Sequence, residues 1–321
     1  MPAHTLNEQI TKYLTDVHSI EEQALTQMKS APKIAGDEEL ARVFSEHLTE
    51  TEEHERRVRA LLEARDAEPS KLKDLAGKAG GIGMLLFARS QPDTPGKLTA
   101  HAFSYEHMEL AAYDLLSLFA ERAGERDVVE LAHAIGPQEK SMAERLAANF
   151  DRAVDASLRE VVDDELENHL IDYLADAHAI EAQAIQMLEA APKIVGDSEL
   201  GKVFRDHLEE TRSQQAAVEA RLNAHDAGPS KLKDAAMRVG ALNMGAFFGA
   251  QPDTPAKLAG FAYAFEHLEI AAYEELKRVA ARAGDDESVR IANEIIPQER
   301  GAAALIHAEF PRAVESTLDG D

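Results

Sequence analysis

The chain repeats itself at a fixed offset, and this repeat limits the possible folds more than any other feature. Residues 13–25 read YLTDVHSIEEQAL, and residues 173–185, 160 positions later, read YLADAHAIEAQAI. The same offset aligns APKIAGDEEL with APKIVGDSEL, QPDTPGKL with QPDTPAKL, and EHMELAAY with EHLEIAAY, without gaps. A gapless internal match predicts that one fold was duplicated. We therefore predict two domains of the same fold, residues 1–155 and 156–321.

Within each half, apolar residues recur at the spacing of amphipathic helices. Turn and cap residues such as Gly36-Asp37 and Gly124 separate four long segments, and no segment alternates like a strand. In the first half the predicted helices cover residues 5–30, 37–66, 95–123 and 126–150, with a short crossover helix in the Gly-rich stretch 71–88. Two helices, a long connection and two more helices are typical of a ferritin-like four-helix bundle. The predicted fold class is all-α: two tandem ferritin-like four-helix bundles, related by a pseudo-two-fold axis.

Composition excludes several classes of partner and site. Lys and Arg total 34 against 59 Asp and Glu, a net charge of −25, so the surface would repel nucleic acid and attract cations. Cysteine is absent, which excludes disulfides, thiolate zinc sites and iron–sulfur clusters and leaves only oxygen and imidazole ligands. The start, MPAHTLNEQI, lacks the features of a secretory signal, and no run is apolar enough to cross a membrane. We predict a cytoplasmic protein.

Glutamates interrupt the apolar stripe of every predicted long helix. On the first helix, Ile10, Leu14 and Val17 lead to Glu21 at spacings of four, three and four. This spacing puts Glu21 on the buried face. The predicted inward carboxylates, all candidate metal ligands, are Glu21, Glu50, Glu106, Glu109 and Glu139 in the first half and Glu181, Glu210, Glu266, Glu269 and Glu299 in the second.

Several carboxylates buried in one bundle need a neutralising partner, because each ionised group loses hydration and repels the others. A single inward Glu is most often solvated at the rim of a bundle. Agreement of four helices, repeated in the second half, reverses that expectation. Because the inward stripes contain almost no Lys or Arg, we predict a pair of metal ions bridged by carboxylates in each half.

Histidines beside the acids are further candidate ligands. His54 lies four residues after Glu50 on the same helical face, so we predict that it binds metal; its counterpart in the second half is Gln214. Four other histidines each precede a predicted ligand by three residues: His18, His47, His178 and His207. For these we keep three alternatives open, namely a ligand, an outer partner that orients a carboxylate, and a histidine on the helix surface.

The motifs resemble the YciE/YciF ferroxidase-like family of the ferritin-like superfamily. They are IEEQAL at 20–25, HLTET at 47–51, EHMELAAY at 106–113 and PQEK at 137–140, and each recurs in similar form in the second half. The resemblance covers nearly the whole chain as two family-sized copies. It implies a four-helix fold with a di-iron site, stress-associated expression, and dimerisation of single-domain members.

The chain departs from many ferritin-like di-iron sites, which use Glu-x-x-His on the second and fourth helices. Here these positions read Glu50-x-x-Glu53 and Glu139-x-x-Met142. In the second half they read Glu210-x-x-Ser213 and Glu299-x-x-Ala302. The predicted sites are therefore rich in carboxylates and poor in histidine, and the second, with Gln214, is predicted to be the weaker.

The leading functional hypothesis is a di-iron protein, with two ions per repeat, that oxidises Fe(II) with O₂ or peroxide. Manganese-dependent peroxide dismutation on the same ligands is an alternative. A second alternative is a stress-related helical module that binds partners without turnover. Tyr113 and Tyr273, beyond the third-helix acids, would supply an electron or, as we favour, fill core space. The expected assembly is a pseudo-dimer within one chain, a monomer rather than a cage.

Overall fold

The computed structural model describes residues 6–70, 94–162, 165–229 and 254–319. Contacts divide the chain into two compact units, residues 1–159 and 160–320. The described residues are helical and include no strand, so the prediction of an all-α fold is confirmed. The predicted division after residue 155 falls inside a helix, α7 (Phe150–Ser157), that belongs to the first unit. The pseudo-two-fold axis stays a prediction.

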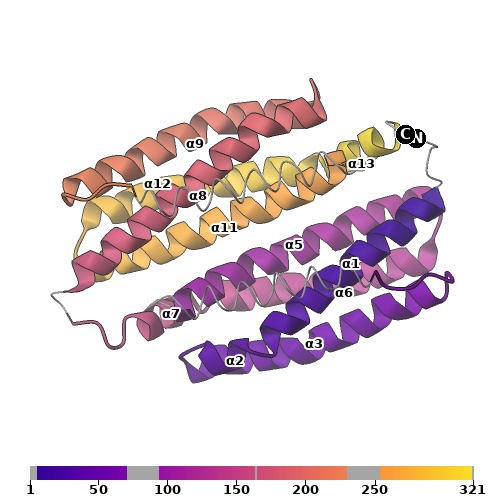
Figure 1. Cartoon of the computed structure of the whole chain (residues 1–321), viewed down its shortest axis with the longest axis horizontal. Helices are drawn as coiled ribbons and strands as arrows, with labels where there is room; N and C mark the ends of the chain where they lie inside the picture. The colour runs from indigo at the N-terminus through magenta and orange to yellow at the C-terminus, as the bar shows by residue number, and fades with distance from the viewer. Residues whose placement is uncertain (1–5, 71–93, 163–164, 230–253, 320–321) are drawn as a thin grey trace. The chain divides into compact units, whose positions relative to one another are not determined.

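Four long helices lie side by side in the first unit (Figure 1). They are α1 (Leu6–Met28), α3 (Glu38–Glu63), α5 (Thr94–Ala123) and α6 (Arg126–Ala147), and they match the predicted segments to within a few residues. Helix α1 packs against α3 and α5, and α6 packs against the same two helices. This pairing makes a four-helix bundle in which each long helix has two long neighbours.

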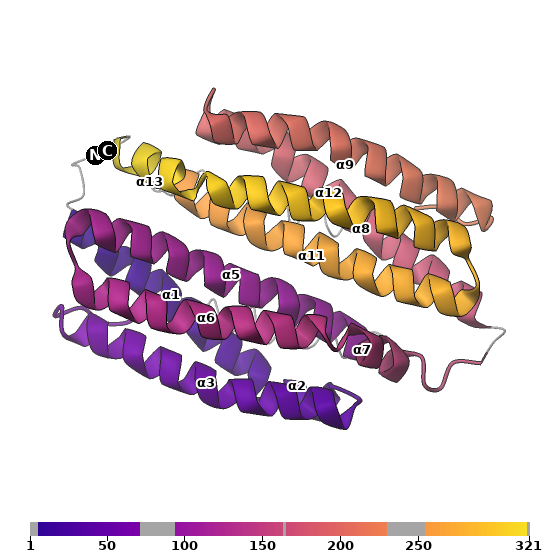
Figure 2. The same ribbon diagram turned by 180° about the vertical axis from the view of Figure 1, so that it is seen from behind.

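The second unit repeats the arrangement, as the reverse view shows (Figure 2). Its long helices are α8 (Leu166–Val195), α9 (Glu199–Ala224), α11 (Thr254–Ala283) and α12 (Asp286–Ala308). Helix α8 packs on α9 and α11, and α12 packs on the same pair. Two repeats of one sequence therefore form two bundles with the same helix order.

Short helices complete each bundle. The predicted first helix ends early and is followed by α2 (Ala31–Ile34), whereas α8 continues to Val195. The break falls at Ser30, whose counterpart in α8 is Ala190, and serine favours helix ends over helix interiors. After the fourth long helix come α7 and, in the second unit, α13 (Phe310–Asp319). The predicted crossover helix at 71–88 lies outside the described residues.

The ends of the third long helices are held by these short helices. The Ser157 hydroxyl of α7 accepts a hydrogen bond from the backbone N–H of Gly96, at 2.9 Å. Thr317 of α13 accepts one from the N–H of Ala256, at 3.2 Å. Because the first N–H groups of a helix lack partners within the helix, these contacts satisfy donors that burial would otherwise leave unpaired.

The bundle interior is built from aliphatic and aromatic side chains around a polar centre. Fully buried residues of the first unit include Leu14, Phe44, Leu116 and Phe119. Several acidic and histidine side chains are just as deeply buried, which is rare unless they are paired or bind metal. None of the described helices has the length and apolarity that crossing a membrane requires.

Candidate metal centre

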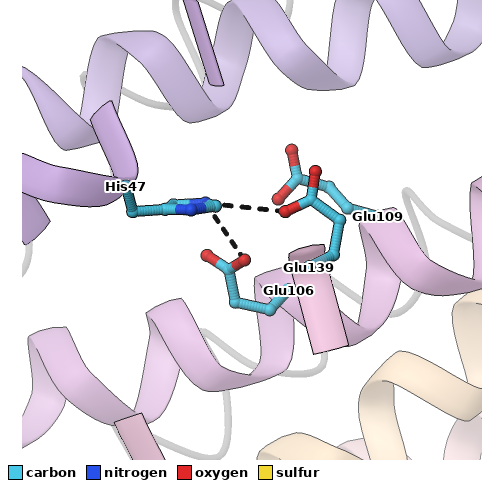
Figure 3. Close-up of side chains that lie close together, drawn as sticks. All are labelled: His47, Glu106, Glu109 and Glu139. Carbon is cyan, nitrogen blue, oxygen red and sulfur yellow. Dashed lines mark ion pairs between the residues drawn. The ribbon is translucent and has the colours of Figure 1, made fainter. Parts of the chain in front are cut away.

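A histidine and three glutamates from three helices converge at the centre of the first bundle (Figure 3). His47 comes from α3, Glu106 and Glu109 lie one turn apart on α5, and Glu139 comes from α6. One potential ligand atom from each of the four lies within 4.8 Å of the others. All four side chains are at most 1% exposed. The arrangement is that of a compact cation site closed off from solvent.

His47 joins this group through Nε2. That atom lies 3.1 Å from Oε2 of Glu106 and 3.6 Å from Oε2 of Glu139. The other ring nitrogen, Nδ1, is 2.9 Å from Oε2 of Glu50. A carboxylate on the outer nitrogen orients the imidazole and makes its inner nitrogen a better metal ligand.

A second group overlaps the first and shares Glu139. It consists of Glu21 from α1, His54 from α3 and Glu139, again with potential ligand atoms within 4.8 Å of one another. His54 Nδ1 is 2.7 Å from Oε1 of Glu139 and 3.9 Å from Oε1 of Glu21. One oxygen of Glu139 therefore faces each group. This is the geometry of a carboxylate that bridges two metal positions.

The pKa values of the buried carboxyls show that their ionised forms are unfavourable without a bound metal. Burial, together with the charge of Glu139, raises the pKa of Glu21 to about 8. Burial likewise raises the pKa of Glu106 to about 7, although the His47 charge opposes the shift. The pKa of Glu109 is raised well above its usual value by burial and by the charges of Glu139, Glu21 and Glu106. Burial and mutual repulsion thus favour protonated carboxyls. A bound cation would neutralise the same carboxylate charges.

Buried ligand atoms without hydrogen bonds provide the test of whether a metal fits. Both carboxylate oxygens of Glu106, Glu109 and Glu139 lack a hydrogen-bond partner, as does Oε2 of Glu21. Nε2 of His47 and Nδ1 of His54 are also without hydrogen bonds, despite their short distances to carboxylates. Buried polar atoms are nearly always hydrogen-bonded. These atoms come from all four long helices of the bundle, and oxygen with imidazole suits iron, manganese and zinc.

Glu50 does not lie where its spacing predicted. The prediction that it points inward is wrong: its side chain is 36% exposed and accepts a hydrogen bond from Arg145 at 2.6 Å. The His47 hydrogen bond, with help from Arg145, lowers the pKa of Glu50 to about 2. Its counterpart Glu210 is more exposed still, at 56%. On α3 and α9, the inward position three residues before these glutamates is occupied by a histidine.

The second bundle repeats the first group. His207 of α9 lies with Glu266 and Glu269 of α11 and Glu299 of α12, all with potential ligand atoms within 4.8 Å. His207 Nε2 is 3.0 Å from Oε2 of Glu266 and 3.4 Å from Oε2 of Glu299. Although burial opposes it, the charge of Glu266 raises the pKa of His207 to about 12. His207 therefore occupies the position in this group that His47 occupies in the first bundle, and that the two histidines are ligands stays a prediction.

Two tyrosines, one on α5 and one on α11, bind the glutamates of α1 and α8. The hydroxyl of Tyr113 donates to Oε1 of Glu21, and that of Tyr273 donates to Oε1 of Glu181. Burial and the Glu21 charge raise the pKa of Tyr113 well above its usual value. The phenol therefore stays protonated and remains a hydrogen-bond donor. The sequence favours a core-packing role for these tyrosines, and their burial agrees with it. The hydrogen bond to the carboxylate is a further contact that the sequence did not predict.

The remaining histidine candidates lie away from these groups. His18 is buried on α1 with Nε2 2.8 Å from Oε1 of Glu55, and it groups with Glu22 and Glu55. Arg59 also binds Glu55, at 2.8 Å, so this cluster already contains a cation. His178 is buried on α8. Neither histidine belongs to the central groups of the described residues.

Fold and site together define a class: a duplicated four-helix bundle with buried carboxylate and histidine groups of the kind that hold metal ions. The sequence matches the family described as "Domain of unknown function (DUF892)" twice, over residues 5–159 and 165–318. The chain therefore belongs to this ferritin-like family and consists of two copies of its domain. No solved structure matched the chain.

Proposed function

We propose that both repeats bind iron at these groups, that the first repeat carries a carboxylate-bridged metal centre, and that the protein oxidises Fe(II) at the expense of O₂ or peroxide. The observation that supports this most is Glu139, which offers one oxygen to each of two ligand groups while neither oxygen has a hydrogen bond. The iron held by these residues would supply the redox chemistry: two Fe(II) would give two electrons, which with two protons reduce one hydrogen peroxide to two water molecules.

The protein's own residues would perform the supporting steps. Glu50 would hold His47 with Nε2 facing inward, and Tyr113 would hold Glu21 at the edge of the site. Full burial of the acids would exclude bulk water from the reacting pair. Stress-associated expression, which the family resemblance implies, and a cytoplasmic location, which the sequence predicts, go with this proposal. Manganese on the same ligands is the alternative, and metal analysis after expression in mixed-metal medium separates the two.

The direct test mixes metal-free protein, loaded anaerobically with Fe(II), with O₂ or peroxide in a stopped-flow instrument. We expect the ferric absorbance to rise much faster than in protein-free buffer. The double variant Glu139→Gln/Glu299→Gln should fall to the rate of buffer, because the amides remove a carboxylate ligand charge from the group in each repeat.

A matched control removes two charges outside the sites. Glu53 and Glu209 lie on the exposed faces of α3 and α9, where they pair with Arg56 and Arg212. The double variant Glu53→Gln/Glu209→Gln should oxidise iron like the unmodified protein. If the unmodified protein is no faster than buffer, or if the Glu139→Gln/Glu299→Gln protein keeps its rate, the proposed function is wrong.

A further inference from the structure

The two repeats differ at one position of the metal centre. Their other inward members match in type: His47 with His207, and Glu21, Glu106, Glu109 and Glu139 with Glu181, Glu266, Glu269 and Glu299. At the remaining position, His54 of α3 corresponds to Gln214 of α9. Both side chains are buried, so the difference lies inside the site and not on the surface.

In the first repeat this position offers a metal ligand. His54 Nε2 is 2.7 Å from Oε1 of Gln138, and this contact leaves Nδ1 facing Oε1 of Glu139. Nδ1 has no hydrogen bond. An imidazole whose outer nitrogen donates to an amide oxygen presents a lone pair on its inner nitrogen. His54 thus completes the second group of the first bundle, with Glu21 and Glu139.

In the second repeat the same position turns an amide hydrogen-bond donor toward Glu299, while the Gln214 amide oxygen is buried without a hydrogen bond. The amide nitrogen of Gln214 donates to Oε1 of Glu299 and, at 3.0 Å, to Oε1 of Gln298. An amide nitrogen has no lone pair available for a metal. Its hydrogen bond also occupies the Glu299 oxygen whose counterpart in Glu139 faces His54. The bridging oxygen is therefore already used.

The acids of α1 and α8 do not distinguish the repeats, because in both a tyrosine holds Oε1 and leaves Oε2 without a hydrogen bond. Tyr273 donates to one oxygen of Glu181 and leaves Oε2 as its free ligand atom. Counting only His, Asp and Glu side chains, the described residues of the second bundle contain the group of His207 with Glu266, Glu269 and Glu299, whereas Gln214 leaves the counterparts of Glu21 and Glu139 without a third ligand of these types. The intact group still has both oxygens of Glu266 and Glu269 without hydrogen bonds.

We infer that the chain binds divalent cations unequally: a pair in the first repeat and a single ion in the second, held by His207, Glu266, Glu269 and Glu299, three ions per chain in all. This inference rests on the proposed function. It makes the first repeat the one suited to two-electron chemistry. The second repeat becomes a one-ion site that stabilises its bundle or holds iron without the paired reaction.

The test measures metal stoichiometry instead of turnover. Metal-free full-length protein is equilibrated with Fe(II) under anaerobic conditions by dialysis, and bound iron per chain is determined by elemental analysis. We expect about three ions for the unmodified chain, about two for His54→Gln and about four for Gln214→His, since these exchanges add or remove one group of ligands. Each variant installs a residue that the equivalent position of the other repeat already accommodates, and circular dichroism checks that it folds.

The outcomes separate this inference from the proposed function. Absence of bound metal in the unmodified chain would overturn both. Four ions in the unmodified chain, or a count unchanged by either exchange, would overturn the inequality of the repeats and leave the proposed metal centre standing. Two ions in the unmodified chain, unchanged in His54→Gln, would show that His54 adds no metal position and would likewise overturn it.

Discussion

At the residue scale, the main result is an exchange of roles within one helical turn. Helical spacing placed Glu50 on the inward face and left His47 open, but the structure turns His47 Nε2 toward Glu106 and Glu139 and leaves Glu50 at the rim. The reason is the partner of Glu50. Arg145 lies on the neighbouring helix α6 and draws the carboxylate outward, where both groups keep part of their hydration.

This exchange predicts a specific phenotype for Glu50→Gln. If Glu50 only orients His47, the amide should weaken metal affinity by roughly 10–100-fold, as loss of an outer-shell partner commonly does, and leave the number of bound ions unchanged. Titration calorimetry with Mn(II) or Fe(II) measures both quantities. Glu53→Gln, an exposed residue on the same helix, is the control and should bind normally. Loss of one bound ion in Glu50→Gln would instead make Glu50 a ligand.

At the scale of elements, the residue at which each helix begins determines how far along the bundle its candidate ligands lie. Helix α3 begins after Asp37, whose side chain accepts hydrogen bonds from the N–H groups of Glu39 and Leu40. The preceding Gly36 has φ +70°, and a Cβ there would lie 2.7 Å from Cγ of Pro95. The entry to α3 thus packs directly on the start of α5, which bears Glu106 and Glu109.

Asp37→Ala should therefore destabilise the first bundle without changing the number of ions it binds. Loss of an N-cap side chain costs about 1 kcal/mol, and chemical denaturation followed by circular dichroism measures it. Ser198 caps α9 by accepting one hydrogen bond, from the N–H of Gly201, so Ser198→Ala tests the same role in the second bundle. An unchanged unfolding free energy in Asp37→Ala would mean that packing alone sets the start of α3.

At the scale of the whole molecule, the buried charges make stability depend on pH. The folded-state pKa values of about 8 for Glu21 and about 7 for Glu106 lie above the ordinary carboxyl value of 4.5. Although burial opposes it, the Glu139 contact raises the pKa of His54 to about 9 from 6.5. In each case the folded state holds a proton that the unfolded chain releases earlier, so stability is lost as pH rises through these windows.

We therefore expect the metal-free protein to be most stable near pH 5 and to lose stability toward about pH 9. The melting temperature should fall by at least about 5 °C, because one pKa unit corresponds to about 1.4 kcal/mol and 1 kcal/mol moves the melting temperature of such domains by about 2–4 °C. Saturating divalent metal should raise the melting temperature most at the high-pH end, since the ligands bind as ionised carboxylates. Differential scanning calorimetry measures both trends.

The Glu139→Gln/Glu299→Gln protein provides the comparison. It should melt at a higher temperature than the unmodified metal-free protein near neutral pH, because one charge has been removed from each buried cluster. It should also gain less stability from metal. A melting temperature of the unmodified metal-free protein that rises from about pH 5 to pH 9 would contradict the origin assigned to the pKa shifts.

The sequence by itself determined the duplication, the helical class, the bounds of the long helices and most inward acids. Periodic apolar stripes are a local property, and Glu21, Glu106, Glu109 and Glu139 interrupt them at positions that any helical wheel turns inward. The repeat then doubled each observation. These features need no knowledge of which helix packs on which.

Only the tertiary structure decided which side chains of a shared face reach the centre. His47 and Glu50 are three residues apart on α3, so spacing alone could not rank them, and the deciding contact, Arg145, comes from a residue 95 positions later. Likewise the sequence shows only that Gln214 replaces the histidine of the first repeat. The structure shows that its amide donates a hydrogen bond to Glu299 on the neighbouring helix α12 and so occupies a carboxylate oxygen of the site. Helical periodicity fixes the face of a residue, whereas its partner is fixed by the helix that packs opposite.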